Sequence, residues 1–158
     1  MKLNKELINF GYKLSKVYKD NLTEFLEIKK EINKDYVEKF FGGWNDKEQA
    51  EYNTKVFKES LNQTLFKSIY FENKLVGFIG YTLYEDKIGC ITMQLLDLKM
   101  RYDFILWYFK ELIKLSKKEE KPIYLKCFKT SKDNEILKLL NFQLINETTS
   151  HNLYIYNV

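Results

Sequence analysis

Apolar residues recur at helical spacing over the first third of the chain. Between residues 20 and 40 the spacing is mostly three or four, which predicts a helix with one apolar face (Leu22, Phe25, Leu26, Ile28 and Ile32). Asp20 stands at the start of this run and is expected to cap the helix with its carboxylate. Gly42 and Gly43 interrupt the pattern. A second helix is predicted over 46–61, with an inner face made by Tyr52, Val56 and Phe57.

Alternating apolar and polar residues predict strands on both sides of these helices. Residues 8–18 mix alternation with turn residues, so a first strand is expected there. After the helices, residues 65–73 and 74–86 each alternate. The two runs meet at Asn73, which predicts a hairpin with a tight turn.

A strand, a helix and another strand follow. Residues 87–98 alternate until the adjacent pair Leu95–Leu96, which indicates either a bulge or burial on both faces. A central helix is predicted over 103–118 and a further strand over 122–128. Two strands joined through a helix lie parallel in one sheet. We therefore expect the fourth and fifth strands to be parallel and splayed.

A short helix and a hairpin are predicted at the end of the chain. The helix covers 131–142, with Ser131 or Asp133 as its cap, and the hairpin follows it. The element order is therefore β, α, α, β, β, β, α, β, α, β, β. That order predicts a mixed α/β (α+β) sheet in a single domain spanning 1–158.

Composition places the chain among globular proteins. Hydrophobic residues make up 45% and charged residues 30%, a balance that supports a buried core. The net charge of +4 is spread over interleaved acidic and basic residues, so we expect no nucleic-acid partner. The longest apolar run, 104–109, is too short to span a membrane, and no signal-like segment is present. A cytoplasmic protein without a membrane partner is expected.

The cysteines and the histidine limit redox and metal chemistry. Cys90 and Cys127 form no CxxC pair, so both are expected to be reduced thiols in the core. His151 is the single histidine, which excludes a site built from several histidines. No metal cofactor is expected.

Residues 98–109, LKMRYDFILWYF, lie where a strand leads into a helix. A helix N-terminus offers N–H groups and the positive end of a dipole, so it is a common place to hold phosphate. Such loops usually contain glycine, but this one has none and carries Asp103. As an N-cap, Asp103 would set its carboxylate over the amides that should hold phosphate. The stretch thus has the position of a phosphate loop without its composition.

The element order and several short segments together resemble the GNAT N-acetyltransferase superfamily over nearly the whole chain. KLSKVYKDN is similar to the family's first strand and helix, NKLVGFIGY to its strand with a Val-Gly pair, and ILKLLNFQLINE to its closing Leu-Tyr-x-x-x-Gly-Phe segment. YVEKFFGGWNDKEQ is similar to a Gly-Trp-Asp-Glu-like segment of one bacterial branch. The resemblance implies a GNAT-like acyl-CoA N-acyltransferase fold, with acetyl-CoA as co-substrate and an amine as acceptor.

The resemblance also implies an acetyl-CoA site. The family motif Arg/Gln-x-x-Gly-x-Gly/Ala falls on Arg101–Leu106, with Phe104 and Leu106 on its two small-residue positions. The family pairs pantetheine with strand backbone at the positions of Leu96 and Leu98. The implied cofactor-binding residues are Leu96, Leu98, Arg101, Tyr102, Asp103, Phe104, Ile105 and Leu106.

The resemblance does not determine the catalytic groups. Leu137 stands where the family often has a tyrosine acid, and Asn141 replaces a glycine while tolerating the left-handed conformation. Thr92 and Gln94 on the fourth strand are weak candidates that can hold a water molecule. Cys127 is either a reactive thiol near the thioester or, as we favour, an inert core residue.

Two functions stay open from the sequence. The first is an acetyl-CoA-dependent N-acetyltransferase that acts by direct transfer on an amine of a small molecule or peptide. It would be a monomer or homodimer, with Trp44 and Tyr36 bordering the acceptor groove. The second is a non-catalytic GNAT-fold module that binds a ligand or a protein. Asp103, the missing glycines and Leu137 favour the second.

Overall fold

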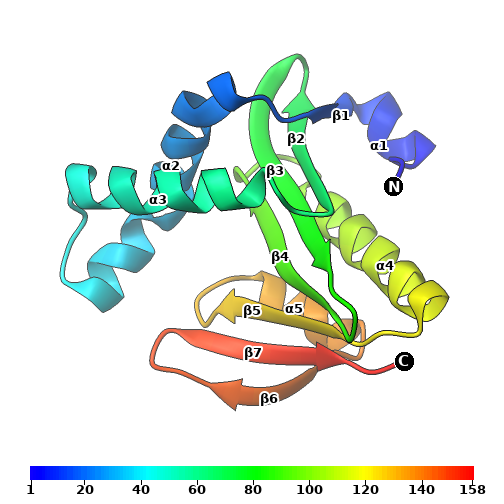
Figure 1. Cartoon of the computed structure of the whole chain (residues 1–158). Helices are drawn as coiled ribbons and strands as arrows, with labels where there is room; N and C mark the ends of the chain where they lie inside the picture. Colours follow the sequence, from blue (N-terminus) through cyan, green and yellow to red (C-terminus); the bar gives the residue numbers. More distant parts are fainter. The chain divides into compact units, whose positions relative to one another are not determined.

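A computed structural model describes all 158 residues (Figure 1). The helices are α1 (Lys5–Phe10), α2 (Leu22–Phe41), α3 (Asp46–Ser60), α4 (Arg101–Glu119) and α5 (Asp133–Leu139). The strands are β1 (Tyr12–Lys16), β2 (Leu65–Phe71), β3 (Lys74–Leu83), β4 (Ile88–Leu95), β5 (Ile123–Phe128), β6 (Gln143–Glu147) and β7 (His151–Tyr156). They form one mixed sheet in the order β1-β2-β3-β4-β5-β7-β6. The predicted mixed α/β fold class is confirmed.

Two compact units make up the chain. The amino-terminal unit comprises Lys2–Gly80 and Thr92–Lys99, and the carboxy-terminal unit comprises Met1, Tyr81–Ile91 and Met100–Val158. Strands β3 and β4 contribute residues to both units. The expectation of a single domain over the whole chain stays a prediction.

Aromatic rings form the core of the amino-terminal unit. The ring centroid of Phe25 in α2 lies 5.0 Å from that of Phe57 in α3 and 5.1 Å from that of Phe78 in β3. All three side chains are buried, and each contributes roughly 1.5–3 kcal/mol through burial. Tyr52, predicted on the same face of α3, is instead 64% exposed. At about 100° per residue it lies about 140° around the helix from Phe57.

Helix α1 is missing from the sequence prediction, which placed a strand at residues 8–10. Asn4 caps this helix by accepting the N–H of Leu7 at 2.9 Å. Gly11, with φ 120°, ends it, and β1 begins only at Tyr12. Local capping therefore outweighed the weak alternation on which the strand prediction relied.

The ends of helix α2 agree only in part with the prediction. Asp20 does not cap the helix: it lies in a 3-10 turn, and α2 has no side-chain cap. Asn21 in that turn accepts the N–H of Tyr18 at 2.8 Å instead. At the other end, Gly42 takes a left-handed φ of 79°, so the double glycine ends the helix as predicted.

The carboxy-terminal unit contains helices α4 and α5 and strands β5, β6 and β7, together with residues 81–91 of β3, β4 and their turn. Four fully buried residues (Phe104, Ile105, Tyr108 and Leu112) mark the inner face of α4. Strand β7 lies between β5 and β6 and is antiparallel to both (Figure 1). The predicted closing hairpin of β6 and β7 is therefore confirmed.

Strands β4 and β5 are parallel, as the crossover through α4 requires. Their register joins Ile88 to Ile123, and the N–H of Ile88 donates to the carbonyl of Pro122 at 2.9 Å. Beyond this pair, residues 89–91 of β4 and 124–126 of β5 line a pocket. The predicted parallel pairing is confirmed, and the pocket lies where the strands were expected to splay.

Helix α4 starts two residues earlier than predicted, at Arg101 instead of residue 103. Met100 precedes it with φ 71°, and its carbonyl accepts the N–H of Phe104 at 3.0 Å. Residues 101–103 therefore form the first helical turn, where the sequence suggested a loop. This shift changes the roles available to Arg101 and Asp103.

Turn residues in the last third of the chain act mostly as expected. Neither alternative for the cap of α5 is its N-cap, which is Lys132 and makes no side-chain cap hydrogen bond. Ser131 Oγ instead accepts the N–H of Asp133, the first residue of the helix, at 3.1 Å. Asn141 takes the predicted left-handed conformation, with φ 65°. Both members of the Leu95–Leu96 pair are at least partly buried, which agrees with burial on both faces.

Candidate functional site

The first turn of α4 is the strongest candidate for anion binding. No side chain caps this end of the helix, and the left-handed Met100 turns the chain into it. The N–H groups of a first turn have no partner within the helix, and the helix dipole makes this end positive. The turn can therefore hold a phosphate or carboxylate through backbone alone.

Asp103 and Phe104 obstruct this turn less than the sequence suggests. Asp103 is the third residue of α4 and exposed, so it is not the N-cap. Phe104 is fully buried, and its ring centroid lies 5.3 Å from that of Trp107. Its bulk therefore fills the core of the carboxy-terminal unit. The remaining obstacle is the negative charge of Asp103.

Arg101 pairs with Asp133 at the start of α5. Its Nη1 lies 3.4 Å from Asp133 Oδ1, and the two side chains are 23% and 11% exposed. Burial raises the pKa of Asp133, and the Arg101 guanidinium only partly offsets this effect. Since Arg101 already contacts a carboxylate, a phosphate would have to compete with Asp133 for it.

Cys127 lies next to this ion pair, near the carboxyl end of β5. Burial raises the pKa of its thiol to about 12, and the Asp133 carboxylate adds to the effect. The thiol also contacts the carbonyl of Phe128, at an Sγ–O distance of 3.6 Å. A thiol that stays protonated at neutral pH is a poor nucleophile. The structure therefore favours the inert core role of Cys127.

His151 begins β7 directly opposite Phe128, and the two ring centroids lie 4.7 Å apart. Ser150 Oγ lies 2.8 Å from His151 Nδ1. Burial, with a smaller effect from Lys126, lowers the pKa of His151. The ring is therefore mostly neutral at pH 7, the form that can accept a proton from an amine.

The other two implied cofactor residues lie in the amino-terminal unit, just after β4. Leu96 packs against the aromatic core, and its N–H donates to the carbonyl of Val76 at 3.0 Å. Its carbonyl is thus the backbone group left for a ligand. Leu98 is half-buried in the segment that leads to α4. Contact of either residue with pantetheine stays a prediction.

Thr92 and Gln94 on β4 are both half-buried. Thr92 Oγ1 lies 3.4 Å from Nε2 of Gln63, so its hydroxyl already has a side-chain neighbour. Gln94 Oε1 is buried and accepts no hydrogen bond from the protein. A buried acceptor without a partner favours an ordered water molecule, the role that the sequence suggested for this residue.

The two implied acceptor residues differ in exposure. Tyr36 of α2 is buried, and its ring centroid lies 5.0 Å from that of Phe40. Trp44, in the loop before α3, is half-buried and donates its indole N–H to Asp46 Oδ1 at 2.9 Å. Asp46 also accepts from Lys30 at 2.8 Å, and these partners lower its pKa. This loop is thus held by polar contacts more than by burial.

One polar network around Asn134 has no counterpart in the sequence prediction. Asn134 of α5 accepts the O–H of Tyr154 at 2.7 Å and an N–H of Asn152 at 3.0 Å. It also donates to the carbonyl of Phe128 at 2.8 Å, which ties α5 to β5 and β7. No feature of the sequence distinguishes this asparagine from a surface amide.

Solved structures of acetyltransferases share this architecture. The PaiA N-acetyltransferase of Thermoplasma acidophilum, in complex with coenzyme A, is 15% identical with a TM-score of 0.67, over 94% of this chain and 99% of that one. An acetyltransferase of Streptococcus agalactiae is 13% identical with a TM-score of 0.66, again over 94% and 99%. The self-immunity acetyltransferase MccE, in complex with acetyl-CoA and AMP, is 14% identical with a TM-score of 0.63, over 96% and 94%.

The fold is that of the GNAT acetyltransferases. The predicted GNAT resemblance is thus confirmed for the fold, while the bacterial branch with a Gly-Trp-Asp-Glu-like segment stays a prediction. No family model matches the sequence. No curated protein matches it either.

The position at which the GNAT resemblance implies a tyrosine acid is occupied by a core residue. Leu137 is fully buried in α5, so its side chain is part of the packing. A tyrosine placed there would have to enter closed core, where extra volume typically costs about 1–3 kcal/mol. Substitution at Leu137 is therefore unsuited to restoring a GNAT acid.

The chain has neither a metal-binding group of side chains nor a helix that could span a membrane. No group of three or more His, Cys, Asp or Glu side chains converges where it could hold a metal ion. None of the helices combines the length and the apolar character needed to cross a membrane.

Proposed function

We propose that this protein is an acetyl-CoA-dependent N-acetyltransferase that transfers acetyl directly to an amine of a small molecule or peptide. The observation that carries the proposal is the uncapped first turn of α4, directly after the strand that pairs in parallel with β5. Similar solved structures hold coenzyme A or acetyl-CoA. The proposed cofactor contacts are backbone at 101–106 and the Arg101 side chain in the carboxy-terminal unit, and backbone at Leu96 and Leu98 in the amino-terminal unit.

Direct transfer is supported by the state of Cys127. An acetyl-enzyme route needs a thiolate, and a thiol whose pKa is raised to about 12 supplies almost none at pH 7. In direct transfer the acceptor amine loses a proton and attacks the thioester carbonyl, and the thiolate of coenzyme A leaves. His151, neutral at pH 7, and a water molecule on Gln94 are the candidate proton acceptors.

We assign the acceptor to the amino-terminal unit. Trp44 supplies a half-buried indole there in a loop ordered by Asp46, and the buried Tyr36 is the second residue that the resemblance implies. The acceptor itself is an amine. We place the protein in the cytoplasm, as a monomer or homodimer that uses neither nucleic acid nor membrane.

A non-catalytic GNAT-fold module is the second candidate. Its support is the burial of Leu137 at the GNAT acid position and the absence of glycine from the α4 turn. Such a module would bind coenzyme A or another anion without turnover. Binding and turnover must therefore be measured separately.

Tyr102, the second residue of α4 and 51% exposed, allows a test of anion binding at this turn. Tyr102→Asp adds a carboxylate to the first turn, which stabilises a helix by about 0.3–1 kcal/mol. The same charge should weaken acetyl-CoA binding about two- to fivefold in calorimetric titration, because it repels phosphate. A purely structural effect would move stability and affinity in the same direction.

Tyr102→Asn is the matched control, since it has the same shape without the charge. It should bind acetyl-CoA as the wild type does. If Tyr102→Asp and Tyr102→Asn bind acetyl-CoA equally, the phosphate does not lie at this turn. Release of coenzyme A over an amine panel then tests turnover. Tight binding without release for any amine would favour the non-catalytic module.

A further inference from the structure

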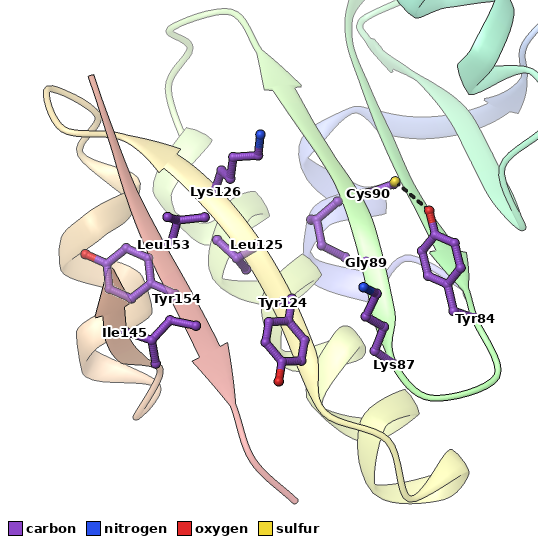
Figure 2. Close-up of a pocket in the computed structure, with 11 residues that line it drawn as sticks. Tyr84, Lys87, Gly89, Cys90, Tyr124, Leu125, Lys126, Ile145, Leu153 and Tyr154 are labelled. Atoms are coloured by element: carbon purple, nitrogen blue, oxygen red, sulfur yellow. Dashed lines mark hydrogen bonds between the residues drawn. The ribbon is translucent and has the colours of Figure 1, made fainter. Parts of the chain in front are cut away.

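A pocket of about 300 Å³ opens between β4 and β5 in the carboxy-terminal unit (Figure 2). The turn between β3 and β4, together with β4, supplies one side, β5 the middle, and β6 and β7 the other side. Its lining residues are Tyr84, Lys87, Gly89, Cys90, Ile91, Tyr124, Leu125, Lys126, Ile145, Leu153 and Tyr154. Its volume is at the lower end of small-molecule sites.

The charge of this pocket is wholly positive. Lys87 and Lys126 are the only basic residues in its lining, which contains no acidic residue, and neither forms an ion pair with a carboxylate. Glu85 and Asp86 precede Lys87 in the chain but do not line the pocket. Two unneutralised ammonium groups beside one cavity attract an anion.

Lys87 is held in place by two aromatic rings. Its Nζ lies 5.4 Å from the ring centroid of Tyr84 and 5.8 Å from that of Tyr124 (Figure 2). Cation–π contacts of this kind order a lysine without neutralising its charge. The ammonium therefore stays available to a ligand and is partly pre-positioned for it.

The remaining surface is apolar and open to solvent. Tyr124 is 40% exposed and Ile145 is 52% exposed, although both line a concave site. Leu153 lies between them on β7, and Figure 2 shows the three side chains along the same run of strands. Apolar side chains left in water around a cavity favour a ligand with a flat apolar body.

We propose that this pocket binds a small organic anion in which an aromatic or similarly flat body carries a carboxylate or a phosphate. The anionic group would lie at Lys87, with Lys126 farther along β5 adding to the positive charge of the pocket, and the apolar body would lie on Tyr124, Leu153 and Ile145. The proposal does not depend on acetyl transfer, because it uses none of the residues assigned to acetyl-CoA.

Cys90 provides a built-in reporter of occupancy. It lines the pocket, and its side chain is exposed, so the prediction of a core thiol was wrong for Cys90. Its Sγ lies 2.9 Å from the hydroxyl of Tyr84. Cys127 is buried, so a small alkylating reagent should reach Cys90 first. A ligand in the pocket should shield Cys90 and slow its alkylation.

The experiment measures alkylation of the full chain by iodoacetamide, followed by intact mass and peptide mapping. Phenylacetate and phenyl phosphate are the probes, and neutral phenylacetamide is their control. We expect saturable protection of Cys90 by at least one anion and little protection by phenylacetamide. Whichever anion protects at lower concentration distinguishes a carboxylate ligand from a phosphate ligand. Saturation-transfer NMR on the same probes detects binding even if Cys90 reacts slowly.

Lysine variants locate the anion. Lys87→Met should raise the probe's dissociation constant about fivefold, because it removes a charge-assisted contact, and Lys126→Met should raise it less, because it removes a more distant positive charge. Lys118→Met, which changes an exposed lysine on α4, should leave it unchanged. For each variant, the rate of Cys90 alkylation with probe is divided by the rate without probe. This ratio corrects for any effect of the substitution on the reactivity of Cys90. Equal binding of phenylacetamide, no binding of either anion, or wild-type affinity in both pocket variants would overturn the proposal.

Discussion

The carboxy-terminal unit contains two regions along β5 that handle charge in opposite ways. At the carboxyl end of the strand, Arg101 and Asp133 are largely buried and contact each other. Nearer the start of β5, Tyr124 and Lys126 are exposed beside an open pocket. At the first region a ligand would meet mainly backbone, because the charged side chains there already have partners. At the second it would meet side chains, so the identity of each residue matters.

The largest expected difference between the two regions is the reactivity of their thiols. At pH 7.5, a pKa of about 12 leaves about one Cys127 thiol in 30,000 ionised. We expect iodoacetamide to modify Cys90 at least ~1,000-fold faster than Cys127, since the thiolate is the reactive form. Peptide mapping over a time course gives both rates. Comparable rates would mean that burial does not separate the two regions, and would reopen the acetyl-enzyme route.

Phe104 should be the most costly side chain to remove from the α4 turn. It is fully buried, and truncating a buried Phe to Ala typically costs about 3–5 kcal/mol. Phe104→Ala should lower the free energy of unfolding by that amount in urea titrations, whereas the exposed Tyr102→Ala should change it by less than about 0.5 kcal/mol. If Phe104→Ala lowers the free energy of unfolding only slightly, the ring lies outside the core and over the backbone amides of the first turn of α4.

These residues also explain how far the sequence could predict the fold. Hydrophobic periodicity located α2, α3 and the β2–β3 hairpin, because each buries one regular face. It failed at α1, where one cap by Asn4 decides the structure. It placed the start of α4 two residues late, because Met100 takes a left-handed conformation, which a sequence usually indicates by a glycine.

The candidate site was less predictable than the fold. A backbone site leaves only a weak trace in the sequence, so the missing glycines suggested a damaged loop although the first turn of α4 is intact. Arg101 and Asp133 are 32 positions apart in the chain, so hydrophobic periodicity cannot predict that they form a pair. The pocket beside Lys87 depends on strands that are neighbours only in the sheet. Those contacts are tertiary, and one sequence does not specify them locally.

Asp133 gives the buried region a pH dependence that the open pocket lacks. Burial raises the pKa of Asp133 in the folded state, so its contribution to stability is present below the unfolded pKa, near 3.8, and is lost as the pH rises through the raised value. The side chain in Asp133→Asn cannot ionise, so this variant should not lose stability as the pH rises. Between acidic and neutral pH, we expect the free energy of unfolding of the variant to rise by about 1 kcal/mol relative to that of the wild type.

Urea denaturation at several pH values between 4 and 8 measures this difference. The exposed Asp20→Asn is the control, and its stability should follow the wild type. A wild type whose stability rises with pH relative to Asp133→Asn would mean that Arg101 outweighs burial. The carboxyl end of β5 would then behave as an ordinary ion pair.

The smallest expected effect is on the charge of the α4 turn itself. Asp103 is exposed in the first turn, where a carboxylate stabilises the helix dipole by about 0.3–1 kcal/mol. Asp103→Asn should therefore destabilise the helix slightly and tighten acetyl-CoA binding about two- to fivefold, because it removes a charge that repels phosphate. The gain should shrink at high salt, since exposed charges are screened.

Calorimetric titration of acetyl-CoA at low and high salt tests this prediction, with Asp20→Asn as the matched control. The effect should be the reverse of that expected for Tyr102→Asp, which adds a charge to the same turn. Affinity that follows the net charge of the turn across both variants would identify a backbone site that side chains only modulate. Affinity that follows Lys87→Met instead would mean that the phosphates lie in the open pocket, and the assignment of the two regions would have to be exchanged.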